Sequence, residues 1–351
     1  MSLAACQKKK VETANPFFEE WTTPYGVPPF DRIRPEHFLP AFERGMSLHN
    51  AEIDAIVGTS DEPTFENTIA AYDASGRMLQ RTSLIFEMLA ASDATPEMQA
   101  VEQEAMPLLA AHADEIRMNE RLFGRIKAVY DRREALPLTA EQRRLTEKLY
   151  RRFVRSGALL DEAGKRRLKE INGDLSRLSV KYGNNLLHEN DAFGLELTAD
   201  RLEGLPNAVR EAAREKAQAA GLGDKSYLFT LHKPSMLPFL SYAKDRKLRE
   251  ELYTAYLDRC NHGDEYDNKA LVNDYIRLRT EKAHLLGYDS YADYVTADQM
   301  AATPAAVYAL LDEIWTPALD RAKEELADVF AAGDKVDVTG TSQGKGYAGV
   351  I

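Results

Sequence analysis

The stretch that decides the fold is RRLKEINGDLSRLSVKYGNNLL, which occupies residues 166–187. This spacing of apolar residues places them on one face of an α-helix and predicts a seam that packs against another helix. The seam residues recur three or four positions apart, at Leu168, Ile171, Leu175, Leu178, Tyr182 and Leu186.

Similar periodicity predicts that helices account for most of the chain. They are expected from Pro35 and from Pro63 onward, and at about 100–130, 140–155, 206–219, 244–257, 265–286 and 304–327. The last helix begins with Thr303 as a hydroxyl cap and Pro304 at the first helical position. Its predicted buried face consists of Val307, Leu310, Leu311 and Ile314.

Two short segments have a period of two instead. Residues 193–197 and 227–231 alternate apolar positions, which predicts two strands that pair as a small ribbon. The predicted fold class is therefore all-α with one small β-ribbon. Ahead of the helices, residues 1–34 are expected to form an extended arm rich in proline. Its aromatic residues Trp21, Tyr25 and Phe30 are expected to hold the arm against the body.

The composition is that of a globular protein. Of 351 residues, 44% are hydrophobic and 29% are charged. No apolar run approaches the ~18 residues that a membrane-spanning helix needs. The formal net charge is -11, from 56 acidic and 45 basic residues, so the helical body is expected to repel nucleic acid and anionic membranes. Small or cationic partners remain open.

The two cysteines exclude a disulfide framework and a thiolate zinc site. Cys260, near the end of a helical run, is predicted to be a buried or inert thiol. Cys6 ends Leu3-Ala4-Ala5-Cys6, which has the form of a bacterial lipobox but lacks the apolar segment that should precede it. Either the match is a chance one and the chain is cytoplasmic, or Cys6 is lipidated. In the second case the written start lies inside a longer precursor of a cell-envelope lipoprotein.

Motifs for catalysis are absent. In a zinc peptidase, His-Glu-x-x-His places two imidazoles on one helix face beside the glutamate that activates the metal-bound water. Only His188-Glu189 begins this pattern, and no second histidine follows, so His188 is predicted to be a solvated residue in a loop. There is no Gly-x-Ser-x-Gly elbow, and the loop from Gly340 to Lys345 has too few residues between its glycines for a phosphate loop. The sequence therefore assigns no catalytic, cofactor-binding or metal-ligating residue.

Two clusters have more than one reading. Asp264, Glu265 and Asp267 could bind a cation, although such acids more often cap and charge the start of a helix. The tyrosines at 288, 291 and 294 could contact a peptide or pack between helices.

Several ordered stretches resemble the thimet oligopeptidase family, in its peptidyl-dipeptidase and oligopeptidase A branch. The resemblance covers about residues 14–328, and it corresponds to the N-terminal part of that family. The order and spacing of the matching stretches along the chain make the resemblance specific. The stretches are NPFF (15–18), TPYGVPPF (23–30), RPEHFLPAF (34–42), PTFENT (63–68), RKLREELY (246–253), NHGDEYDN (261–268), LLGY (285–288), YADY (291–294) and TPAAVY (303–308).

The resemblance implies one half of a two-lobed, mostly helical peptidase whose lobes flank a channel for short peptides. Such enzymes release dipeptides from the C-terminus of oligopeptides or cut them internally. Their zinc is held by His-Glu-x-x-His and a later glutamate, all in the second half, and none of these ligands maps onto this sequence. Zinc is thus expected in the full-length parent and not on this chain. The expected partners are short peptides and the missing C-terminal half.

The last residues depart from that family. Residues from about 330 to 351 resemble the third protein of the large ribosomal subunit, where such a glycine loop approaches ribosomal RNA. A random glycine-rich end is the alternative. The predicted organisation is an arm at 1–34, a helical peptidase lobe at 35–330 and an unrelated strand and glycine-rich tail at 331–351.

Two functional hypotheses follow. The first is a truncated zinc oligopeptidase that is inactive alone; the second is a non-catalytic helical protein that binds peptides. Truncation is preferred, because a helical half that loses its partner half leaves apolar surface uncovered.

Overall fold

The computed structural model describes residues 15–329. It divides into two compact units, Met1–Leu286 and Gly287–Ile351, which are described separately. The possible lipobox at Cys6 and the predicted tail at 331–351 lie outside the described residues.

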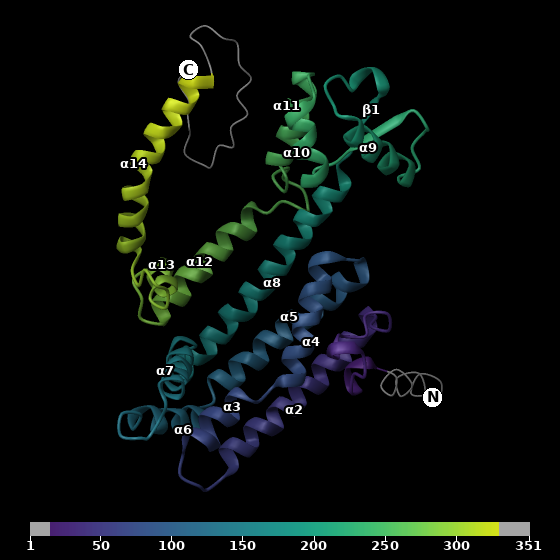
Figure 1. The fold of residues 1–351 in the computed structure, drawn as a ribbon. Helices are drawn as coiled ribbons and strands as arrows, with labels where there is room; N and C mark the ends of the chain where they lie inside the picture. Colours follow the sequence, from purple (N-terminus) through teal and green to yellow (C-terminus); the bar gives the residue numbers. More distant parts are fainter. Residues whose placement is uncertain (1–14, 330–351) are drawn as a thin grey trace, which may run out of the picture. The chain divides into compact units, whose positions relative to one another are not determined.

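The first unit is built from helices and one two-stranded sheet (Figure 1), which confirms the predicted class. Short 3-10 helices lie at Pro16–Phe18, Pro24–Gly26, Pro35–His37 and Ala199–Arg201, and a π-helical turn lies at Phe65–Ala70. The longer elements are α2 (Phe38–Gly58), α3 (Ala71–Asp73), α4 (Arg77–Ser92), α5 (Pro96–Arg117), α6 (Glu120–Asp131), α7 (Ala140–Arg155), α8 (Glu162–Ala192), β1 (Leu195–Thr198), α9 (Asn207–Ala219), β2 (Ser226–Phe229), α10 (Lys233–Tyr242), α11 (Arg246–Leu257) and α12 (Lys269–Leu285).

Local sequence explains where these helices begin. Thr139 and Gln142 form a reciprocal capping box at the start of α7, and Asp161 accepts from the Gly164 N–H at the start of α8. Thr95 caps α5, where Pro96 occupies the first helical position. Helix α10 was not predicted, and it contains an internal proline, Pro238. Pro238 is the sixth residue of α10 and has no N–H for the carbonyl of residue 234, so the helix forms with one internal hydrogen bond fewer.

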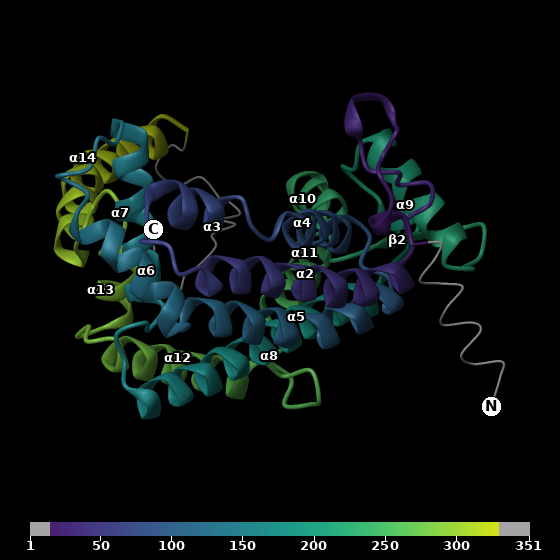
Figure 2. The same ribbon diagram turned by 90° about the horizontal axis from the view of Figure 1, so that it is seen from below.

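Helices α2, α5, α8 and α12 lie side by side in succession (Figures 1 and 2). The predicted seam of α8 is confirmed only in its first half, where Leu168 and Ile171 are fully buried. Tyr182, farther along, is 44% exposed, and the seam residue Leu186 lines a cavity. The predicted helix face of α2 is confirmed, since Phe38 and Phe42 are buried.

The predicted ribbon is also confirmed. Strands β1 and β2 pair antiparallel, with Leu195 opposite Phe229 and Leu197 opposite Tyr227. The inward side chains of the ribbon join a core with α9, α10 and α11, in which Phe229 packs 4.5 Å from Phe239 between ring centroids. This core covers the end of α8.

The N-terminal arm is held by fewer aromatic side chains than expected. Phe17 is buried, and the Trp21 ring donates from Nε1 to the Pro16 carbonyl at 2.8 Å, with the Arg81 guanidinium 4.1 Å above it. The expectation for Tyr25 and Phe30 is wrong, since both are exposed. Tyr25 lies in a turn at φ 60°, which directs its side chain into solvent.

The described part of the second unit contains α13 (Tyr291–Thr296) and α14 (Pro304–Val329). Tyr294 packs against Tyr288 and Tyr291, with ring centroids 5.3 and 5.7 Å apart, so these tyrosines pack together. The predicted burial of the α14 face is wrong, because Leu310, Leu311 and Ile314 are all more than half exposed. The six-residue α13 is too short to cover a helix of 26 residues.

Candidate functional site

The principal candidate site is a cavity of about 940 Å³ between the α4–α5 turn and the second half of α8. We call it the α8 cavity. Phe86 and Met98 are buried at its wall on the α4 and α5 side, and Val180, Leu186 and Leu187 of α8 also line it. This is the place where the α8 seam stops packing against another helix. A volume of this size fits the range of small-ligand sites in proteins.

Acidic groups predominate among the charged side chains of the α8 cavity. Its lining contains Glu87, Asp93, Glu102 and Asp191, whereas His232 is the single basic residue that residues 15–329 contribute there. His232 Nε2 lies 3.4 Å from Asp191 Oδ1. Burial raises the pKa of the Glu102 carboxyl. The cavity therefore joins an apolar wall to an excess of carboxylates.

A second cavity of about 460 Å³ contains a pair of histidines from α2 and α5. His49 Nδ1 lies 3.1 Å from His112 Nε2, and His49 Nε2 lies 3.2 Å from Ser75 Oγ. Ser75 uses its own proton to donate to the Tyr72 carbonyl at 2.7 Å, so His49 Nε2 must be the donor to Ser75. His49 Nδ1 then accepts from His112 Nε2, which fixes both tautomers as neutral rings.

This histidine relay should make the fold sensitive to acid. Burial lowers the pKa of His49, helped by the neighbouring His112, and burial lowers the pKa of His112; Glu52 and Glu115 oppose these shifts. Because a proton on His49 Nδ1 would face the His112 N–H, the folded protein resists that proton more than the unfolded chain does.

We expect full stability above pH 6.5, the ordinary pKa of the unfolded histidines, and a progressive loss as the pH falls through their lower folded-state pKa values. Urea unfolding at pH 7.5, 6.5 and 5.5 measures this. His112→Gln keeps a donor to His49 and should lose less stability than the native chain between pH 7.5 and 5.5. An equal loss in both proteins would contradict the role of the pair.

A buried polar network joins α5, α8 and α12. Asp114 is 5% exposed and accepts from Asn172 Nδ2 at 2.9 Å on both carboxylate oxygens. Lys282 Nζ donates to Asn172 Oδ1 at 2.6 Å. Burial raises the pKa of Asp114 and lowers that of Lys282, so desolvation outweighs their mutual attraction. Because the three side chains hydrogen-bond to one another and each comes from a different helix, the network holds the three helices together.

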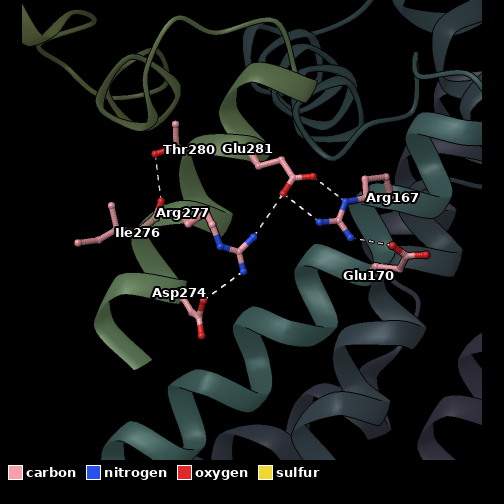
Figure 3. Close-up of polar contacts among 7 residues, drawn as sticks. All are labelled: Arg167, Glu170, Asp274, Ile276, Arg277, Thr280 and Glu281. Atoms are coloured by element: carbon pink, nitrogen blue, oxygen red, sulfur yellow. Dashed lines mark hydrogen bonds and ion pairs between the residues drawn. The ribbon is translucent and has the colours of Figure 1, made fainter. Parts of the chain in front are cut away.

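Surface ion pairs continue the contact between α8 and α12 (Figure 3). Arg167 donates from Nε and Nη2 to Glu281 at 2.6 and 2.9 Å, and it also reaches Glu170 at 2.8 Å. Arg277 lies between Glu281 and Asp274. Such exposed pairs contribute little to stability, so this cluster positions α12 without defining a site for chemistry.

The residues that the sequence singled out do not form a catalytic site. The prediction for His188 is half right: it is exposed, but it lies in α8, and its ring stacks on Tyr266 with centroids 3.7 Å apart. The carboxylate of Asp267 accepts the backbone N–H groups of Lys269, the first residue of α12, and of Gly263 in the preceding loop, both at 2.8 Å. Cys260 is buried, as predicted.

No group of three His, Cys, Asp or Glu side chains within residues 15–329 is placed to hold a metal ion. The described helices also include none that is long and apolar enough to span a bilayer. Sequence reasoning missed the α8 cavity and the histidine pair. His49 and His112 are 63 positions apart, and no local spacing brings them together.

Comparison with known proteins shows that this chain is similar to peptidases. A family described as Peptidase family M3 matches residues 239–340. The dipeptidyl carboxypeptidase of Escherichia coli K12 is 37% identical over 324 residues, which are 92% of this chain and 47% of the relative. The oligopeptidase A of Haemophilus influenzae is 30% identical over 87% of this chain and 45% of the relative. A probable cytosolic oligopeptidase A of Arabidopsis thaliana is 29% identical over 90% of this chain and 45% of the relative.

These matches confirm the predicted resemblance: over most of its length the chain is similar to peptidases of the thimet oligopeptidase family, in the dipeptidyl carboxypeptidase and oligopeptidase A branch. The chain spans about half the length of the curated relatives that it matches. The Peptidase family M3 match extends to residue 340, past the predicted start of the tail at 331. The ribosomal resemblance of the tail stays a prediction.

Proposed function

We propose that this chain is one part of a zinc-dependent peptidase that acts on short peptides, and that it is inactive alone. The observation that carries the proposal is 37% identity to a dipeptidyl carboxypeptidase across 92% of a chain that contains no His-Glu-x-x-His. The relatives' names support release of dipeptides from the carboxyl end or internal cleavage of oligopeptides.

The described residues do not fit a catalytic zinc ion, which needs three protein ligands around an open position. We therefore assign no zinc-dependent step to them. Zinc would be held by the part of the relatives that this chain does not cover. The contribution of this chain would be a rigid helical wall with the α8 cavity in it.

The missing half is the partner that we propose for α14. The large apolar residues of α14 fall within an arc of about 180° when they are placed at 100° per residue. Tyr308, Leu311 and Trp315 lie in this arc, and each is more than half exposed. A covering segment of similar length to this chain is present in the relatives, since each is about twice as long as the matched region.

A peptidase assay tests the proposal. We expect no turnover of a short quenched peptide by the 351-residue chain, with or without added zinc, because the water-activating glutamate and the metal ligands are absent from its sequence. Zinc-dependent turnover that a chelator abolishes would contradict it. To control for copurified host peptidases, the chain is mixed with chelator and passed through a size-exclusion column before the assay.

A second candidate is a non-catalytic peptide-binding protein, favoured by the volume and mixed lining of the α8 cavity. Genomic context separates the two. A reading frame with His-Glu-x-x-His directly downstream favours the peptidase, and stable peptide binding by a monomer without such a frame favours the binding protein.

We also propose that the chain acts in the bacterial cytoplasm, or at the cell envelope if Cys6 is lipidated, with no nucleic-acid partner for its acidic helical body. Metabolic labelling with a fatty-acid analogue tests the location. Label that is lost in Cys6→Ser would place the protein at the envelope and contradict a cytoplasmic location.

A further inference from the structure

The α8 cavity has carboxylates without cations to pair with them. Glu87, Asp93 and Glu102 all line it, and no Lys or Arg within the described residues forms an ion pair with any of them. His232, the basic residue of the lining, already lies beside Asp191. Arg259 is not part of the lining, and its Nη1 donates to the lining residue Asn190 at 2.7 Å. The charge of this cavity therefore favours a cationic ligand.

Glu102 is the carboxylate for which a ligand cation matters most. It is half-buried on α5, between Met98 and Met106 of the same lining. A carboxylate that loses water without gaining a partner is costly, and a cation that enters the cavity removes that cost. Surface acids elsewhere on the chain keep their water and gain little from a cation.

The apolar wall restricts which cation fits. Phe86, Met98 and Leu187 offer a surface for an aliphatic or aromatic group, next to the carboxylates. A peptide's free amino end carries its positive charge and its first side chain on the same carbon atom, so one residue satisfies both surfaces. The carboxyl end of a peptide would instead be repelled by the carboxylates.

We propose that the α8 cavity binds the free amino end of a short peptide whose first side chain is apolar, with Glu102 as the partner of the α-ammonium group. This inference rests on the proposed function, which supplies peptides as the ligands. It assigns an orientation to them: the amino end lies at α8 and α5, and the rest of the peptide leads away.

Calorimetric titration of the 351-residue chain tests the orientation. The probe is the pentapeptide Leu-Ala-Gly-Ala-Ala, compared with its N-acetylated form and its C-terminal amide. We expect acetylation to weaken binding about tenfold or more, as for the loss of a charge-assisted hydrogen bond, and amidation to leave binding unchanged or stronger. Mass spectrometry after the titration confirms that the peptides are intact.

The variant Glu102→Gln keeps the size of the side chain and removes its charge. It should bind the free and acetylated peptides with similar affinity. Glu104→Gln is the matched control, because Glu104 is exposed on the same helix and does not line the cavity; this variant should discriminate as the native chain does. Discrimination that survives Glu102→Gln, equal binding of both peptides by the native chain, or no binding would overturn the inference. Zinc-dependent hydrolysis by a longer protein would still stand in that case, so the two proposals fail separately.

Discussion

Asp114→Ala is expected to destabilise the protein by about 1–3 kcal/mol, the usual cost of leaving a buried hydrogen-bonding group without its partner. The substitution removes both acceptors of Asn172 Nδ2, and it removes the nearby carboxylate whose charge favours the half-buried Lys282 ammonium group. Lys282 then has to lose its charge or draw water between α5, α8 and α12. Urea unfolding monitored by circular dichroism measures the change in the free energy of unfolding.

The double variant Asp114→Ala, Lys282→Met provides the control for this effect. Replacing both charges by apolar groups is often nearly neutral, so the double variant should be more stable than Asp114→Ala alone. If the effects of the two substitutions on the free energy of unfolding were additive, Asp114 would not stabilise the Lys282 ammonium group. That result would remove the network as the connection between the three helices.

Phe38→Ala is expected to cost about 3–5 kcal/mol, because it opens a cavity in a close-packed aromatic core. Phe38 is 0% exposed, and its ring lies 5.2 Å from Phe17 and 5.1 Å from Phe86 between centroids. The substitution therefore loosens the N-terminal arm and α4 together. Thermal and urea unfolding both report the loss.

Leu48→Ala is the matched control on the same helix. Leu48 is 44% exposed, and its truncation should change stability by no more than about 0.5 kcal/mol. A small effect of Phe38→Ala, comparable with that of the control, would mean that the aromatic core contributes little to the stability of α2.

Local patterns were enough to predict most of the fold. The period of three to four residues located α2, α7, α8, α11, α12 and α14, and alternation located both strands of the ribbon. Periodicity identifies the apolar face of a helix but does not show what covers it. For this reason the first half of the α8 seam was right, whereas the exposure of α14 was not predicted.

The candidate site could not be predicted in the same way. The α8 cavity combines residues from 86 to 106 with residues from 176 to 191 and with His232, so it depends on helix packing across long sequence separations. The histidine pair has the same origin. The absence of the zinc motif was readable from sequence, because that chemistry needs its ligands at a fixed local spacing.

Reconstitution in trans is the most direct test of the central claim that this chain is one part of a zinc peptidase. The 351-residue chain is mixed with the segment of the Escherichia coli dipeptidyl carboxypeptidase that it does not cover, and hydrolysis of a short peptide is followed with and without zinc. The account predicts no turnover by either part alone and zinc-dependent turnover by the mixture. Turnover by the 351-residue chain alone, at a rate that the added segment does not change, would contradict it.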